Sequence, residues 1–69
     1  MDIEKIKKHI GKRIKTLRTE NNLSQEQFSE CVGISREHIS CIEHGKYMIS
    51  IDKLYNIAEY FEVDIKSFF

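Results

Sequence analysis

Residues 25–44 read QEQFSECVGISREHISCIEH, and this stretch decides the fold. Two short helical patterns meet in it at Gly33, and each is opened by a serine, Ser24 or Ser35, of the kind that caps helix N-termini. The first opening, SQEQ, has the form of a capping box, in which serine and glutamine side chains each satisfy the other's backbone N–H. Glycine adopts the positive φ that a sharp turn between helices requires. The stretch therefore predicts a helix-turn-helix over about residues 24–45.

The remaining residues also carry helical patterns. Isoleucines and a leucine recur at steps of three or four through residues 2–20, which predicts one amphipathic helix with lysines on its outer faces. Ser50 and Asp64 are expected to cap a fourth helix and a last short turn, IKSFF. Five helices and no strand are predicted in a single all-α domain over residues 1–69. The expected buried face of the fourth helix consists of Ile51, Leu54, Tyr55, Ile57, Ala58 and Phe61.

The charge of the chain is zero in total but unevenly distributed. Residues 1–20 hold seven basic and three acidic side chains, whereas residues 21–46 and 47–69 each hold two basic and four acidic ones. A neutral total counts against strong non-specific attraction to nucleic acid, because phosphate contacts supply most of that attraction. The lysines of the first helix can equally be a solvated face that keeps the protein soluble.

Neither a metal site, a disulfide framework nor a catalytic set is predicted. Cys31 and Cys41 lie ten residues apart, form no CxxC pair, and have no histidine cluster at zinc-finger spacing. No run of eighteen apolar residues exists, and the first ten residues mix charges with isoleucines. A nucleophile–base set and a glycine-rich phosphate loop are also lacking. We therefore expect a soluble cytoplasmic protein that has no cofactor and is not an enzyme.

Taken together, these motifs resemble a known family. Residues 10–69 are similar to the phage repressor and Cro-type (XRE) helix-turn-helix family, including its landmarks LSQ at 23–25, GIS at 33–35 and I-E-x-G-K at 42–46. The resemblance implies a compact five-helix, lambda-repressor-like DNA-binding domain. Small stand-alone members of this kind include restriction-modification controller proteins, phage-type repressors and antitoxins of toxin–antitoxin pairs.

The resemblance also implies which residues read DNA bases. The third helix would be the recognition helix and would enter the major groove. Arg36 is the best single candidate, because arginine can donate two hydrogen bonds to guanine O6 and N7. Glu37 could accept from a cytosine amino group or could orient Arg36. Cys41 could instead be a small buried apolar residue. The residues expected nearest the base edges are Ser35, Arg36, Glu37, Ser40 and Cys41.

Phosphate contacts are expected on either side of the recognition helix. By the resemblance, Gln25 in the first turn of the second helix would bring that helix N-terminus against a phosphate, and Ser24 would assist. Lys46 and the backbone that follows it match a loop that touches the sugar-phosphate chain in relatives. His38 and His44 flank the third helix and could donate to phosphate.

One further pair is expected to be structural. Arg18 and Glu43 match two residues that form a partly buried salt bridge in many relatives, tying the first helix to the end of the third. No DNA contact is assigned to them.

The C-terminal end is the expected dimer interface. It carries more apolar area than so small a domain readily buries, and exposed apolar patches mark partner surfaces. The alternative is that Phe68 and Phe69 fold back into the core. We predict a sequence-specific transcriptional regulator that binds double-stranded DNA as a homodimer, with half-sites about 34 Å apart; a module that binds a partner protein is the alternative function. The predicted interface residues are Tyr60, Phe61, Val63, Ile65, Phe68 and Phe69.

Overall fold

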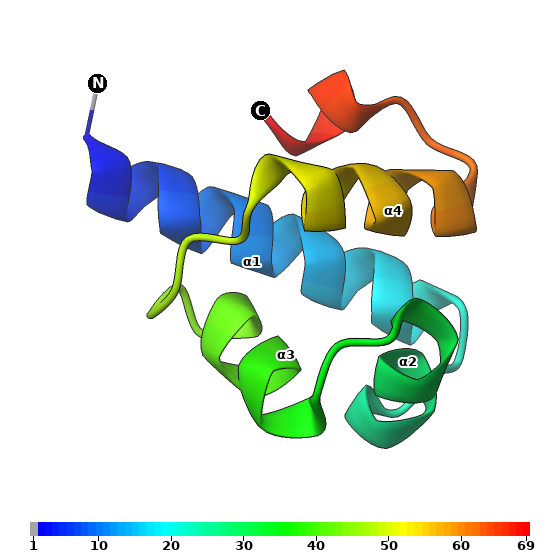
Figure 1. Cartoon of the computed structure of the whole chain (residues 1–69). Coiled ribbons are helices and arrows are strands. Elements are labelled where there is room, and N and C mark those ends of the chain that lie inside the picture. The colour runs from blue at the N-terminus through cyan, green and yellow to red at the C-terminus, as the bar shows by residue number, and fades with distance from the viewer. Residues whose placement is uncertain (1) are drawn as a thin grey trace.

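The computed structural model describes residues 2–69, which fold into four α-helices and one 3-10 helix (Figure 1). No strand occurs among these residues, so the all-α prediction is confirmed. The expected fifth helix is a single 3-10 turn of four residues. The elements are α1 (Ile3–Glu20), α2 (Gln25–Val32), α3 (Arg36–Glu43), α4 (Ile51–Phe61) and η1 (Ile65–Phe68).

The caps and the turn of the helix-turn-helix form as the sequence predicts. Ser24 Oγ accepts from the Gln27 backbone N–H at 3.0 Å, and the Gln27 side chain accepts from the Ser24 N–H at 2.9 Å, which completes the capping box. Ser35 Oγ accepts the backbone N–H of His38 at the start of α3. Gly33 ends α2 with a φ of 69°, in the left-handed region that glycine adopts without strain.

The two remaining predicted N-caps are Asp64 and Ser50, and only Asp64 makes a capping hydrogen bond. Asp64 accepts the Lys66 N–H at 2.9 Å and so caps η1. Ser50 precedes α4, but its side chain accepts no N–H of the helix. A hydrogen bond between the Ser50 side chain and Asp52 is instead the main cause that lowers the pKa of the Asp52 carboxyl.

The predicted buried face of α4 is partly wrong. Ile51 and Tyr55 are 65% and 53% exposed, and α4 buries Leu54, Ile57 and Ala58 instead. Ile51 and Tyr55 lie to one side of this buried stripe, where no other element of the described chain covers them. Because α4 packs on only one side against α2 and η1, a narrow stripe is enough to join it to the core.

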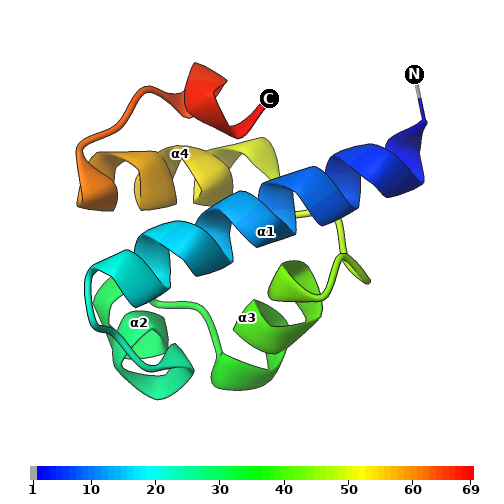
Figure 2. The same cartoon turned by 180° about the vertical axis from the view of Figure 1, so that it is seen from behind.

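Helix α1 is the central element of the fold. In both views it runs between α4 with η1 on one side and α2 with α3 on the other (Figures 1 and 2). Its contact with α3 requires Gly11, because a Cβ there would collide with the backbone carbonyl oxygen of Ile42. The core around α1 is formed by Ile10, Ile14, Leu17, Phe28, Ile34, Ile39, Ile42, Ile49, Leu54, Ile57, Ala58 and Phe68.

Candidate nucleic-acid interface

Helix α3 has one buried face and one free face. Ile39 and Ile42 are fully buried, and with Ile34 of the preceding turn they fix α3 against the core. The opposite face carries four of the five predicted base-reading residues in exposed positions: Ser35, Arg36, Glu37 and Cys41. The fifth, Ser40, is half-buried. The structure therefore leaves four of the five predicted residues uncovered, and the alternative that Cys41 is a buried apolar residue is wrong.

Arg36 and Glu37 form the only ion pair on that face within residues 2–69. Arg36 Nη2 lies 3.8 Å from Glu37 Oε1, near the limit for a salt bridge, and both side chains are exposed. An exposed contact of this length contributes little to stability. The guanidinium forms no hydrogen bond with the described part of the chain, so its donors are free to bind a ligand. Glu37 lies where it can orient Arg36, although so long a contact does not fix the Arg36 side chain in one position.

Arg18 and Glu43 form a bidentate salt bridge between α1 and α3, at the position where the resemblance placed it. Arg18 Nε donates to Glu43 Oε2 at 2.7 Å, and Arg18 Nη2 donates to Glu43 Oε1 at 3.0 Å. The remaining guanidinium nitrogen, Nη1, donates to the Leu23 carbonyl oxygen at 2.7 Å. Both charged side chains are buried, so the geometry compensates for the water they lose.

Gln25 is part of the same hydrogen-bonded network. Its amide Nε2 donates to Glu43 Oε1 at 3.1 Å, and the residue is half-buried. The side chain is therefore directed toward α3, and the groups of this turn that remain for an anion are the free backbone N–H groups and the Ser24 hydroxyl. No local pattern in the sequence reveals this bond, because it joins residues of two different helices.

The loop after α3 has a fixed geometry. The Gly45 N–H donates to the Ile42 carbonyl at 3.0 Å, and the Lys46 N–H donates to the Cys41 carbonyl at 2.9 Å. These two bonds, with a φ of 73° at Gly45, are a Schellman motif. Lys46 is exposed and is held directly beyond the end of α3.

The two histidines near α3 are engaged within the protein. The His38 ring packs edge-on against Tyr47, with 4.2 Å between ring centroids, and its Nε2 is buried without a hydrogen-bond partner in the described residues. His44 Nδ1 lies 2.7 Å from the Ser40 carbonyl oxygen, so that nitrogen carries the proton. His44 Nδ1 is already used within the protein and His38 Nε2 is buried, which does not favour phosphate contacts of His38 and His44 through these atoms.

At the C-terminus the two neighbouring phenylalanines have opposite environments. Phe68 is 0% exposed and belongs to the core. Its predicted place in a dimer interface is therefore wrong, and the alternative, that it folds back into the core, is correct. The 3-10 turn directs Phe68 inward and leaves Phe69 66% exposed. Tyr60 is also exposed, whereas Phe61, Val63 and Ile65 are half-buried against the core.

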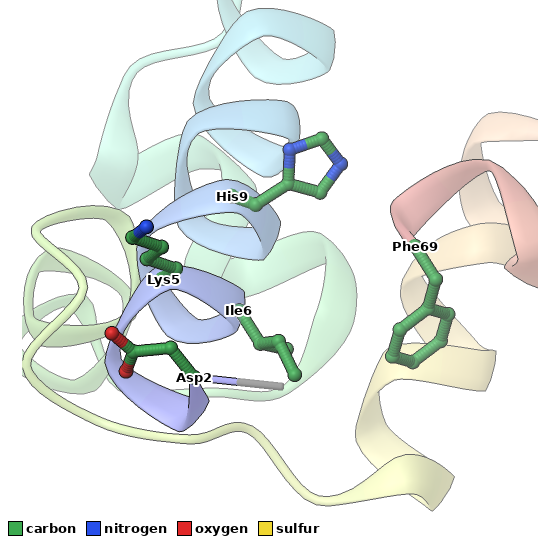
Figure 3. Close-up of a pocket in the computed structure, with 5 residues that line it drawn as sticks. All are labelled: Asp2, Lys5, Ile6, His9 and Phe69. Atoms are coloured by element: carbon green, nitrogen blue, oxygen red, sulfur yellow. The ribbon is translucent and has the colours of Figure 1, made fainter.

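A groove of about 410 Å³ separates Phe69 from the start of α1 (Figure 3). Its lining residues are Asp2, Lys5, Ile6, His9 and Phe69, and the close-up shows Ile6 and Phe69 on opposite sides of the gap. Within residues 2–69 no group of histidine, cysteine and carboxylate side chains could hold a metal ion. No helix of the described chain is both long enough and apolar enough to cross a bilayer.

A family model described as a helix-turn-helix domain matches residues 11–69. The chain belongs to this family of helix-turn-helix transcriptional regulators. It is 40% identical over 57 residues to an uncharacterized HTH-type transcriptional regulator of Archaeoglobus fulgidus, covering 83% of this chain and 80% of the relative. The restriction-modification controller protein C.AhdI from Aeromonas hydrophila has the same fold, with a TM-score of 0.88 at 25% identity over the whole of both chains.

Other members are longer proteins. An uncharacterized transcriptional regulator of Rhodospirillum rubrum is 36% identical over 67 residues, which are 97% of this helix-turn-helix chain and 62% of the relative. The antitoxin PezA of Streptococcus pneumoniae is 41% identical over 54 residues, which are 78% of this chain and 34% of the relative. The predicted resemblance and the predicted absence of enzymatic activity are confirmed by this family of regulators.

Proposed function

We propose that the chain is a sequence-specific DNA-binding regulator of transcription that acts as a homodimer on a two-fold symmetric operator. The observation that carries the proposal is the division of α3 into a fully buried face and an uncovered polar face. Packing needs Ile39 and Ile42, but it does not need Arg36 or Glu37. In a helix-turn-helix protein, the exposed side chains of this helix that take no part in packing are available to contact base edges.

Arg36 carries most of the proposed base recognition. Its guanidinium is exposed and free of hydrogen bonds within residues 2–69, so both outer donors can pair with guanine O6 and N7. Ser35, Glu37, Ser40 and Cys41 complete the reading surface. Phosphate contacts come from the first turn of α2, at Ser24 and the backbone of Gln25, and from Lys46 after α3.

Dimer formation follows from the size of the interface. A single module of this kind covers only about 600–1,000 Å² of protein surface on DNA, which supports few base contacts. A second subunit doubles those contacts, and the exposed Phe69 and Tyr60 supply an apolar surface for it. Phe68 takes no part, because it is already buried.

Selection from a random double-stranded DNA library tests the proposal, with the wild type, Arg36→Ala and Arg13→Ala in parallel. We expect a palindromic motif for the wild type, and loss of preference at one base position per half-site for Arg36→Ala, worth about 1–3 kcal/mol of discrimination. Arg13→Ala, which removes an arginine of α1 outside the helix-turn-helix, should leave the motif unchanged. No enriched palindrome with the wild type would refute the proposal.

Binding to a partner protein is the second candidate function. The neutral net charge and the similarity to the antitoxin PezA favour it. The two functions differ in their response to salt. DNA binding through several phosphate contacts weakens steeply as salt rises, whereas an interface between two proteins of low net charge does not.

A further inference from the structure

Gly45 brings two distant lysines together. A Cβ at Gly45 would lie 2.6 Å from Lys8 Cγ and 3.0 Å from Lys8 Cα, so the Gly45 backbone rests directly on α1. Lys46 is the next residue along the loop. Both views show this loop passing beside the N-terminal half of α1 (Figures 1 and 2). The backbone of Lys46 therefore lies close to Lys8 beside the end of α3, although the two residues are far apart in the sequence.

The two lysines have no acidic partner in the described chain. The ion pairs of residues 2–69 join Lys7 to Glu4, Arg18 to Glu43 and Arg36 to Glu37, and none includes Lys8 or Lys46. Both side chains are exposed. Two exposed lysines that start from neighbouring stretches of backbone and have no carboxylate partner among the described residues leave positive charge uncompensated at this place, and a bound anion would neutralise it.

Tyr47, the next residue of the loop, carries a hydroxyl. It is exposed and follows Lys46 in the loop, while its ring is held by the edge of the His38 ring from α3. The Schellman motif at Gly45 and this ring contact fix the loop from both sides. The backbone of the loop therefore continues directly from α3, at the end of the proposed base-reading face.

We propose that Lys8, Lys46 and Tyr47 form a phosphate-binding corner, which extends the DNA interface from the helix-turn-helix onto α1. In this proposal His38 is a positioning residue that holds Tyr47 and does not touch DNA. The proposal rests on the proposed function. If α3 lies in the major groove, the sugar-phosphate backbone of the DNA passes the end of that helix. The lysines act as point charges and the tyrosine hydroxyl donates to a phosphate oxygen.

A salt series of DNA binding tests Lys8, the lysine that extends the proposed interface onto α1. Binding of the selected operator and of a scrambled duplex is measured for the wild type, Lys8→Ala and Lys66→Ala, with sedimentation confirming an unchanged association state. Lys8→Ala should weaken binding to both duplexes and make the slope of log K against log salt shallower by about 0.9 per subunit. Lys66→Ala removes an exposed lysine of η1, on the far side of α1 from α3, and should match the wild type.

Four further variants test the Tyr47 hydroxyl and the His38 ring that holds Tyr47. Tyr47→Phe keeps the ring and should lower the affinity for both duplexes roughly two- to tenfold. The salt slope should not change, since a neutral hydroxyl releases no counterion. His38→Ala should lower the affinity by the same factor. The double variant of Tyr47→Phe and His38→Ala should bind no more weakly than either single variant. His38→Phe keeps a ring beside Tyr47 and should recover most of the affinity, which a direct phosphate contact by His38 would not allow.

The possible failures are distinguishable. A wild type that binds no DNA overturns the proposed function and the corner with it. A wild type that binds with a steep salt slope, alongside a Lys8→Ala variant identical to Lys66→Ala, overturns the corner alone. If Lys8→Ala weakens binding to an acidic partner protein but not to DNA, the corner belongs to a protein interface and the proposal is wrong.

Discussion

Arg18 on α1 and Glu43 in the last turn of α3 share two hydrogen bonds, of 2.7 and 3.0 Å, with both side chains buried. The pair connects the central helix to the proposed recognition helix, and Gly11, two turns earlier in α1, lies against the backbone of Ile42 and Glu43. The orientation of the proposed base-reading face therefore depends on residues that are themselves buried.

Removing one member of this pair should destabilise the fold. Glu43→Ala leaves the Arg18 guanidinium buried with only the Leu23 carbonyl as a partner, and we expect the free energy of unfolding to fall by about 3–5 kcal/mol. Urea denaturation at neutral pH measures the change. Arg36→Ala, which breaks only an exposed contact, is the control and should stay within about 0.5 kcal/mol of the wild type. Equal effects of the two variants would contradict this prediction.

Two glycine substitutions should differ because the two sites differ. Gly11→Ala drives a methyl group into the Ile42 backbone and should cost about 1–3 kcal/mol or more, because neither helix backbone can move aside easily. Gly33→Ala meets no atom within 4 Å, so only its φ of 69° opposes it, at about 1 kcal/mol. Thermal unfolding of both variants gives the comparison, and a larger loss for Gly33→Ala would contradict the steric argument.

The hydrogen bond between Ser50 and Asp52 should be visible as a pH effect at one carboxyl. It lowers the pKa of Asp52 from the ordinary 3.8, so the stabilisation is present above that value and is lost as pH falls through the folded-state pKa. Ser50→Ala removes the largest cause of the shift. An NMR titration of the Asp52 carboxyl should therefore show its pKa rising in the variant, whereas an unchanged pKa would show that Ser50 is not the cause.

Phe68 and Phe69 should respond oppositely to substitution. Phe68→Ala opens a cavity in the core and should lower the free energy of unfolding by about 3–5 kcal/mol. Phe69→Asp changes an exposed side chain, so the subunit should stay folded while the proposed dimer dissociates. Circular dichroism follows folding and sedimentation follows association. Monomers for both the wild type and Phe69→Asp would refute the C-terminal interface.

The local signals in the sequence predict the local structure well. Ser24, Ser35 and Gly33 mark the helix starts and the turn at their actual positions, because capping and positive φ depend only on nearby residues. The burial of Ile39 and Ile42 follows from helical spacing in the same way. The pairing of Arg18 with Glu43 needed the family resemblance, since the two residues lie on separate helices.

The errors arise where burial depends on distant elements. Helical spacing alone placed Ile51 and Tyr55 in the core, but no element covers that side of α4. Phe68 and Phe69 are chemically identical, and only the 3-10 turn decides which of them points inward. The contact of Lys8 with Gly45 is likewise a product of the tertiary fold, which a lysine-rich helix pattern cannot reveal.

A single carboxylate joins three helices. Glu43 of α3 accepts from Arg18 of α1 and from Gln25 of α2, so both halves of the helix-turn-helix are fastened to the scaffold through the same group. In the proposed complex such a unit would need little rearrangement on binding, so little chain entropy would be lost. Discrimination between operators would then come from side chains such as Arg36 and from how easily each DNA sequence bends to fit the protein surface.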